Sequence, residues 1–138
     1  MRVREAGEAD LPLIIELARS LEVDYPGMDG DKFWVAEDEK GRVAGAVALK
    51  RHPDCLELCG LGVAPRHRRK GVAKALVEAL MAAAQGDVHL ATVIPGFFAA
   101  LGFARTPGVP QTFIDKRKTE WCEGCDQRLC TVMVRKAS

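Results

Sequence analysis

The stretch LGVAPRHRRKGVAKALVEAL, at residues 61–80, constrains the fold more than any other part of the chain. It begins as the end of an apolar strand, passes through a loop rich in arginine and lysine, and reaches Gly71. A helix is predicted from there to residue 84, because apolar side chains recur at helical spacing. Another strand is predicted over residues 87–93. Two strands joined through a helix usually lie parallel in one sheet, so this region predicts a β-α-β unit.

The other predicted elements precede and follow this unit. They are a strand over 1–6, a helix over 7–23, strands over 33–38, 43–52 and 55–64, a short helix over 96–103 and a last strand over 129–136. Short turns join the three strands before the basic loop, which predicts an antiparallel meander. The predicted fold class is therefore α/β (in the wider sense α+β), with a mixed central sheet that combines an antiparallel N-terminal meander with a β-α-β unit.

The net charge bears on what the basic loop binds. The chain has 20 Lys and Arg against 19 Asp and Glu, which gives a net charge of +1. A dedicated nucleic-acid-binding domain is usually more basic, so nucleic acid is not the expected partner. The positive charge of the loop is local and favours a small anionic ligand. At 138 residues, we expect a single domain over 1–138.

The N-terminal sequence MRVREAGEAD lacks the basic and then apolar pattern of a signal peptide. The apolar runs of the sequence are too short to span a bilayer. We therefore expect a cytoplasmic protein with no membrane partner. The expected partner is a small molecule, and a homodimer is compatible with the sequence.

The basic loop has the features of an anion site at the start of a helix. The first backbone N–H groups of a helix lack partners within the helix, and the helix dipole is positive there. A phosphate group can accept those N–H groups, and Gly71 lets it approach the backbone because glycine has no Cβ. Ala73 is small, and Arg68, Arg69 and Lys70 attract a multiply charged ligand. The alternative is a solvated basic loop before an ordinary helix.

The segment from Leu61 to Leu80 resembles the signature of the GNAT superfamily of acetyl-CoA-dependent N-acetyltransferases. Their motif, Gln/Arg-x-x-Gly-x-Gly/Ala, is matched by Arg68, Gly71 and Ala73, and their Leu-Gly-Phe segment is matched by FFAALGF at residues 97–103. The resemblance implies the GNAT fold, with acetyl-CoA as co-substrate and a strand that splays from the next to hold pantetheine. The residues it implies for CoA binding are Leu61, Gly62, Val63, Arg68, Arg69, Lys70, Gly71, Val72 and Ala73.

Acetyl transfer to an amine requires that a proton leave the ammonium form. In histone-type members of the superfamily the base is a glutamate fourteen residues before the loop glycine, and Glu57 holds that position. The resemblance makes Glu57 the candidate base or amine-orienting group, and the alternative is a structural glutamate. Phe98 stands where many members have the tyrosine that protonates the thiolate. Tyr25, in the loop after the first predicted helix, is a weaker candidate for that acid.

A cysteine cluster lies in the C-terminal segment 105–130. Cys122, Cys125 and Cys130 have the Cys-x2-Cys-x4-Cys spacing. A Cys-x2-Cys turn suits tetrahedral zinc, and Cys55, Cys59 or a histidine could supply the fourth ligand of a structural site. The alternatives are a cap of reduced thiols over the sheet and a redox disulfide.

The sequence VPQTFI at 109–114, followed by these cysteines, resembles the end of short bacterial N-acetylglutamate synthase-like proteins. Thr112 replaces their usual lysine. A glutamate site needs cations for two carboxylates, and Lys116, Arg117 and Lys118 lie in the corresponding segment. The expected function is transfer of acetyl from acetyl-CoA to a primary amine of a small molecule, by direct attack in a ternary complex. The alternatives are glutamate as the specific acceptor and a non-catalytic CoA-binding or interaction module.

Overall fold

The computed structural model describes residues 1–116 and 130–137. Its contacts divide the chain into two compact units. The first contains residues 1–50 and 58–83, and the second contains residues 51–57 together with residues from 84 onward. Strand β4 contributes its first two residues to the second unit and the rest to the first.

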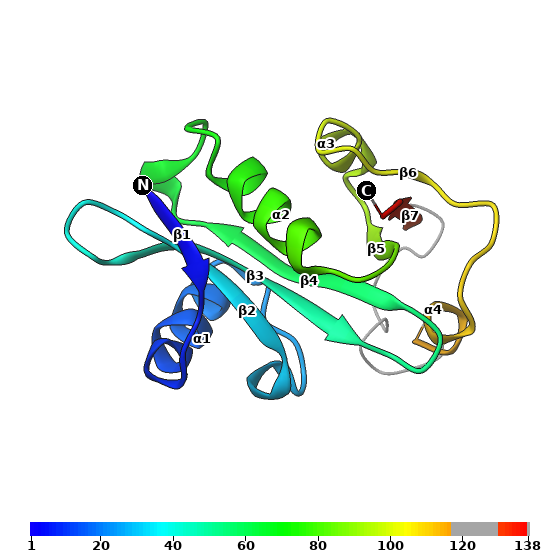
Figure 1. Ribbon diagram of the computed structural model, residues 1–138, viewed down its shortest axis with the longest axis horizontal. Coiled ribbons are helices and arrows are strands. Elements are labelled where there is room, and N and C mark those ends of the chain that lie inside the picture. The colour runs from blue at the N-terminus through cyan, green and yellow to red at the C-terminus, as the bar shows by residue number, and fades with distance from the viewer. Residues whose placement is uncertain (117–129, 138) are drawn as a thin grey trace. The chain divides into compact units, whose positions relative to one another are not determined.

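The first unit consists of the antiparallel meander and two helices (Figure 1). Its strands are β1 (Arg2–Glu5), β2 (Lys32–Glu37), β3 (Val43–Arg51) and β4 (Leu56–Val63), which are hydrogen-bonded neighbours in that order. Its helices are α1 (Leu11–Ser20) and α2 (Val72–Ala83), with short 3-10 turns η1 (Glu8–Asp10), η2 (Met28–Gly30) and η3 (Pro65–His67). The register pairs β1 with β2 and β2 with β3 in antiparallel fashion, which confirms the predicted meander.

Helices cover both faces of β2 and β3. On one face, Phe33 and Ala48 pack in a core cluster with Ile14 of α1. On the other face, a Cβ at Gly45 would lie 3.1 Å from a methyl carbon of Leu76 on α2. Because both faces are covered, β3 is buried continuously from residue 44 to residue 49, as is usual for strands between two helical layers.

The second unit contains strands β5 (Val88–Thr92), β6 (Ala104–Arg105) and β7 (Thr131–Arg135), with helices α3 (Pro95–Ala99) and α4 (Gln111–Lys116). β5 pairs in parallel with the start of β4, at Leu56–Val88 and Glu57–His89, and pairs antiparallel with β7. β7 in turn pairs with β6. The strand order across the described residues is β1-β2-β3-β4-β5-β7-β6, a mixed sheet of seven strands.

These observations confirm the predicted α/β class and each of the nine predicted strands and helices. The glycine predicted to end the helix before Phe103 does so: Gly102 has φ +92° and donates to Ala99 O, while Phe103 N–H donates to Phe98 O at 3.1 Å. The sequence reading missed β6, α4 and the 3-10 turns, which are too short to show a period. The single domain over 1–138 stays a prediction.

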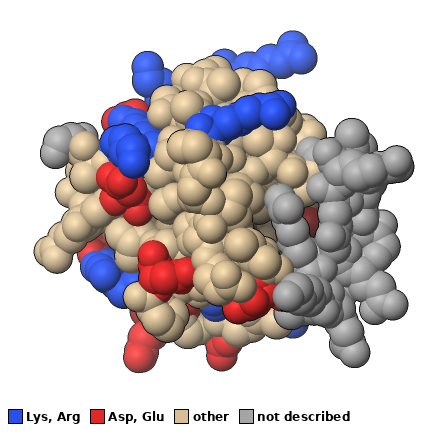
Figure 2. All heavy atoms as spheres, turned by 90° about the vertical axis from the view of Figure 1, so that its right-hand side faces the viewer, with Lys and Arg blue, Asp and Glu red and all other residues tan. Residues whose placement is uncertain are grey.

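None of the helices in the described ranges has the length and apolar character needed to cross a membrane. Figure 2 shows Lys and Arg side chains together with Asp and Glu side chains on one face of the molecule. Both signs of charge on that face agree with a net charge of only +1.

Candidate functional site

The basic loop between β4 and α2 has an unusual backbone. After β4 ends at Val63, the chain makes the 3-10 turn η3, and two residues then adopt left-handed conformations. Arg69 has φ +64° and Gly71 has φ +77°. A non-glycine residue in this region is uncommon and costs conformational energy. The backbone therefore turns sharply twice immediately before α2 begins at Val72.

The start of α2 presents backbone donors at this loop. The first hydrogen bond of the helix runs from Ala75 N–H to Gly71 O, at 3.0 Å. Within the described parts of the chain, the N–H groups of residues 69–74 have no recorded hydrogen-bond partner. A Cβ placed on Gly71 would have no atom within 4 Å, so the space over this glycine is open. The arrangement has the space and the donors that a phosphate group needs, and phosphate binding by residues 68–73 stays a prediction.

The strand end that leads into the loop is tightly packed. A Cβ on Gly62 would lie 2.9 Å from Leu21 Cδ1, so only glycine fits there without a shift. The Arg68 side chain turns back, and its Nε donates to Val63 O at 3.2 Å. Arg68 therefore fixes the loop against the end of β4, in addition to adding charge.

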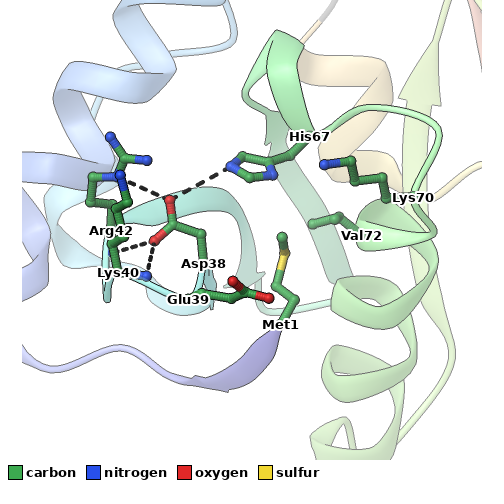
Figure 3. A pocket seen from close by; sticks show the side chains of 8 residues that line it. All are labelled: Met1, Asp38, Glu39, Lys40, Arg42, His67, Lys70 and Val72. Atoms are coloured by element: carbon green, nitrogen blue, oxygen red, sulfur yellow. Dashed lines mark hydrogen bonds and ion pairs between the residues drawn. The ribbon is translucent and has the colours of Figure 1, made fainter.

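The hairpin between β2 and β3 contacts the loop through His67 (Figure 3). Its Nε2 lies 3.6 Å from Asp38 Oδ2. Asp38 also accepts hydrogen bonds from the backbone N–H groups of Arg42 and Lys40, and the Arg42 bond in particular lowers the Asp38 pKa to about 2. These residues line a cavity of about 480 Å³ that Lys70 and Val72 border from the loop side. Asp38 is therefore an ionised carboxylate whose hydrogen bonds lie within its own hairpin, next to the loop.

Glu57 lies at the centre of a polar cluster in the second unit. Glu57 is buried, with 3% of the residue's surface exposed. Oε1 lies 2.7 Å from His52 Nε2, and Oε2 lies 2.8 Å from Lys116 Nζ. Burial alone would raise the pKa of Glu57, but the charge of Lys116 and the hydrogen bonds from Lys116 and His52 outweigh it and leave the pKa lowered. The group is therefore a carboxylate at neutral pH with a cationic or donor partner on each oxygen.

The turn between β3 and β4 is joined to α4 beside this cluster. Asp54 accepts hydrogen bonds from the Thr112 N–H, at 3.2 Å, and from the Thr112 hydroxyl. Phe113 on α4 is buried, with its ring 6.2 Å from the His89 ring. The Cys55 thiol in the same turn has its pKa raised to about 11 by burial and by the charge of Asp54, so it is not a thiolate at neutral pH.

His52 and α4 are parts of this cluster that the sequence reading missed. A signal was available, since His52 lies five residues before Glu57 at the end of a hairpin strand. The Lys116 ammonium, predicted as a cation for a substrate carboxylate, is paired with Glu57 in this structure. Arg117 and Lys118, predicted for the same purpose, lie outside the described residues.

Two aromatic residues considered for the acid step have other contacts. The Tyr25 hydroxyl donates to Asp31 Oδ2 at 2.7 Å, and its ring packs beside Gly60. Phe98 is buried and makes edge contacts with Phe97 and Phe103. Phe98 therefore belongs to the core of the second unit and offers no proton.

The predicted cysteine cluster is described only in part. Cys122 and Cys125 lie outside the described residues. Cys130, Cys55 and Cys59 are half-buried and form no disulfide with a described residue. Among the residues that the structure describes, no group of three metal-ligating side chains comes together. Zinc binding by these cysteines therefore stays a prediction.

The chain is similar to several solved structures. N-acetylglutamate synthase from Neisseria gonorrhoeae, complexed with coenzyme A and N-acetyl-glutamate, superposes with a TM-score of 0.79 at 23% identity, over 99% of this chain and 35% of that one. Rv2747 from Mycobacterium tuberculosis, in complex with CoA and NLQ, superposes with a TM-score of 0.72 at 23% identity, over 99% of each chain. The GNAT family N-acetyltransferase YhbS from Escherichia coli, in complex with CoA, superposes with a TM-score of 0.66 at 18% identity, over 99% of this chain and 81% of that one.

This chain spans about a third of the length of the Neisseria enzyme. At these identities the likenesses establish the fold. No curated protein sequence matches the chain. The model of the acetyltransferase (GNAT) family matches residues 7–106, well over half of the sequence. The chain therefore belongs to the acetyltransferase (GNAT) family, and its enzyme class is that of an N-acetyltransferase.

Proposed function

We propose that the protein transfers an acetyl group from acetyl-CoA to the primary amine of a small molecule, by direct attack in a ternary complex. The observation that carries this proposal is the loop of residues 68–73, with open space over Gly71 and, among the described residues, no hydrogen-bond partner for the N–H groups from residue 69 onward. In this role the loop binds the pyrophosphate of CoA. Leu61, Gly62 and Val63 at the end of β4 offer main-chain groups to the pantetheine and the acetyl carbonyl.

The side chains of the loop have separate parts in this proposal. Arg69 and Lys70 are exposed and attract the phosphates of CoA. Arg68 holds the loop through Val63 O. Val72 is buried and anchors the first turn of α2, while Ala73 keeps that turn free of bulk. The protein thus holds the donors ready before CoA arrives, which limits the entropy lost on binding.

Glu57 is proposed to act on the amine side of the reaction. Both of its oxygens have partners, and its pKa is lowered. A general base works best with a pKa near the operating pH, so this geometry favours a carboxylate that orients other groups over one that takes the proton itself. The acid step falls to water or to the incoming amine, since Phe98 has no hydroxyl.

Glutamate is the specific acceptor that we propose to test first. The Neisseria enzyme that resembles this chain was solved with N-acetyl-glutamate, and VPQTFI resembles the end of short synthases of that kind. Against it, Thr112 replaces a lysine of that group, and the Lys116 ammonium is paired with Glu57. The competing function is a CoA-binding module without catalysis.

The test is thiol release from acetyl-CoA in the presence of a panel of amines that includes L-glutamate, other amino acids, polyamines and amino sugars. Release that depends on both enzyme and amine, with an N-acetylated product by mass spectrometry, supports the proposal. CoA binding without release for any amine would support the non-catalytic module.

The zinc proposal has its own test. Elemental analysis of protein purified without chelator should give about one equivalent of zinc if Cys122, Cys125 and Cys130 hold a structural ion with a fourth ligand. Less than about a tenth of an equivalent of zinc, with all five thiols titratable, would instead support the alternative of a cap of reduced thiols.

A further inference from the structure

The polar cluster at the start of β4 contains a group that the function described above does not use. His52 is joined to the buried Glu57 carboxylate through Nε2, at 2.7 Å. Its side chain is 15% exposed, against 4% for the side chain of Glu57. The imidazole therefore lies nearer to solvent than the carboxylate behind it.

The pairing determines which nitrogen of the imidazole carries a proton. The Glu57 carboxylate is ionised and can only accept hydrogen bonds. In the neutral imidazole, Nε2 must then be the donor, and Nδ1 keeps its lone pair. A carboxylate that fixes the tautomer of a histidine in this way prepares the other nitrogen to take up a proton and stabilises the imidazolium that results.

The ion pair with Lys116 keeps the Glu57 carboxylate in its charged form. The Lys116 ammonium lies 2.8 Å from Oε2 on the side away from the His52 contact at Oε1. With Lys116 in place, Glu57 remains charged and holds its position, and a proton delivered to it would cost the ion pair. The more favourable proton acceptor of the cluster is His52.

We propose that His52 is the proton acceptor for the acceptor amine and that Glu57 is the positioning residue that orients it. The inference rests on the proposed acetyl transfer and names the group that performs its proton step. The ammonium of the acceptor gives one proton to His52 Nδ1, and the neutral amine attacks the thioester carbon. The C–N bond forms and the C–S bond breaks. A second amine proton passes to the leaving thiolate, which yields the amide and CoA-SH, and the imidazolium returns its proton to solvent.

The charged and titratable groups around this pair come from three segments. Glu57 faces His52 from β4, Lys116 faces Glu57 from α4, and Asp54 and Cys55 lie in the same turn as His52. Cys55 stays a neutral thiol through the neutral range because its pKa is raised to about 11.

The experiment compares His52→Gln, His52→Ala, Glu57→Gln and Lys116→Met with the unaltered protein. It measures thiol release with acetyl-CoA and L-glutamate, or with the panel amine of highest turnover where glutamate is inactive. CoA affinity and the melting temperature are recorded for each variant. We expect His52→Gln to lower kcat by about 10²–10⁴-fold with CoA affinity unchanged. Glu57→Gln keeps a hydrogen-bond partner for His52 and should lower kcat less.

Chemical rescue separates a proton acceptor from a structural histidine. Added imidazole should restore part of the activity of His52→Ala, after subtraction of a reaction without enzyme, and should have no such effect on Lys116→Met. A loss of less than about threefold in His52→Gln would overturn the inference, because removal of a general base costs far more. The inference would also be overturned if the His52 variants lost activity only in proportion to their lowered melting temperature and imidazole restored none of it. Absence of thiol release by the unaltered protein with every amine would instead overturn the proposed function.

Discussion

Asp54 and Thr112 stand 58 positions apart in the sequence, and the carboxylate of Asp54 accepts hydrogen bonds from both the N–H and the hydroxyl of Thr112. The carboxylate thereby caps the N-terminus of α4, which has only six residues. A helix of this length is not stable by itself in water. The cap and the buried Phe113 are therefore what keep Lys116 within reach of Glu57.

The first prediction concerns this cap. Asp54→Ala should release the first turn of α4, and amide exchange over residues 111–116 should become faster. Asp115→Ala is the matched control, because Asp115 is exposed on the same helix and bonds only the Gln111 side chain among the described residues. Equal exchange in the two variants would show that the cap does not hold α4.

The cap also predicts a pH dependence. The hydrogen bonds from Thr112 lower the pKa of Asp54 in the folded state. A carboxyl with a lowered pKa stabilises the fold above its unfolded pKa, about 3.9, and this stabilisation is lost as the pH falls through the folded pKa. Asp54→Ala should therefore reduce the loss of α4 protection that occurs below about pH 4. Amide exchange over residues 111–116, measured as a function of pH in Asp54→Ala and in the unaltered protein, would test this.

The second prediction concerns Lys116 and Glu57. Lys116→Met leaves the buried carboxylate without its ammonium, so burial should raise the Glu57 pKa, and stability should fall by roughly 3 kcal/mol near neutral pH. The double variant Lys116→Met with Glu57→Gln no longer buries a charge and should recover part of that loss. Denaturant unfolding of the four proteins gives the coupling free energy. A coupling near zero would show that the pair contributes nothing to stability.

The third prediction concerns Gly45 of β3, which packs against β4 and α2. A Cβ there would lie 3.1 Å from the backbone oxygen of Gly62 on β4 and 3.1 Å from Leu76 Cδ1 on α2, so Gly45→Ala should cost about 1–3 kcal/mol through overpacking. Gly30→Ala is the control, since a Cβ on Gly30 has no atom within 4 Å. Similar unfolding free energies for the two variants would contradict the close approach of β3 to α2.

The sequence was most informative where a periodic pattern of apolar residues extended over many positions. The β-α-β unit was predicted because α2 has twelve residues with a clear apolar face. The open Gly71 was predicted because an anion site at a helix start needs a residue without Cβ. These local rules were sufficient for the fold class and for the basic loop.

The polar cluster could not be predicted in the same way. Lys116 and Glu57 are 59 positions apart, and Asp54 meets Thr112 only because the β3–β4 turn and α4 pack together. Such contacts depend on tertiary packing, and α4 itself has too few residues to show a helical period. His52 and Glu57 are only five positions apart, but their side chains meet because the chain folds back at the β3–β4 turn. From the sequence alone, His52 is therefore only the last residue of a strand.

The central claim is that the loop of residues 68–73 binds CoA, and calorimetric titration of CoA tests it most directly. Gly71 and Gly27 share a φ of +77°, and a Cβ on either has no atom within 4 Å. Gly71→Ala and Gly27→Ala should therefore cost similar stability, about 1–2 kcal/mol for a left-handed alanine. We predict that only Gly71→Ala weakens CoA binding, by about tenfold or more, because its Cβ occupies the place of the phosphate. Equal CoA affinity in the two folded variants would contradict the assignment of the loop.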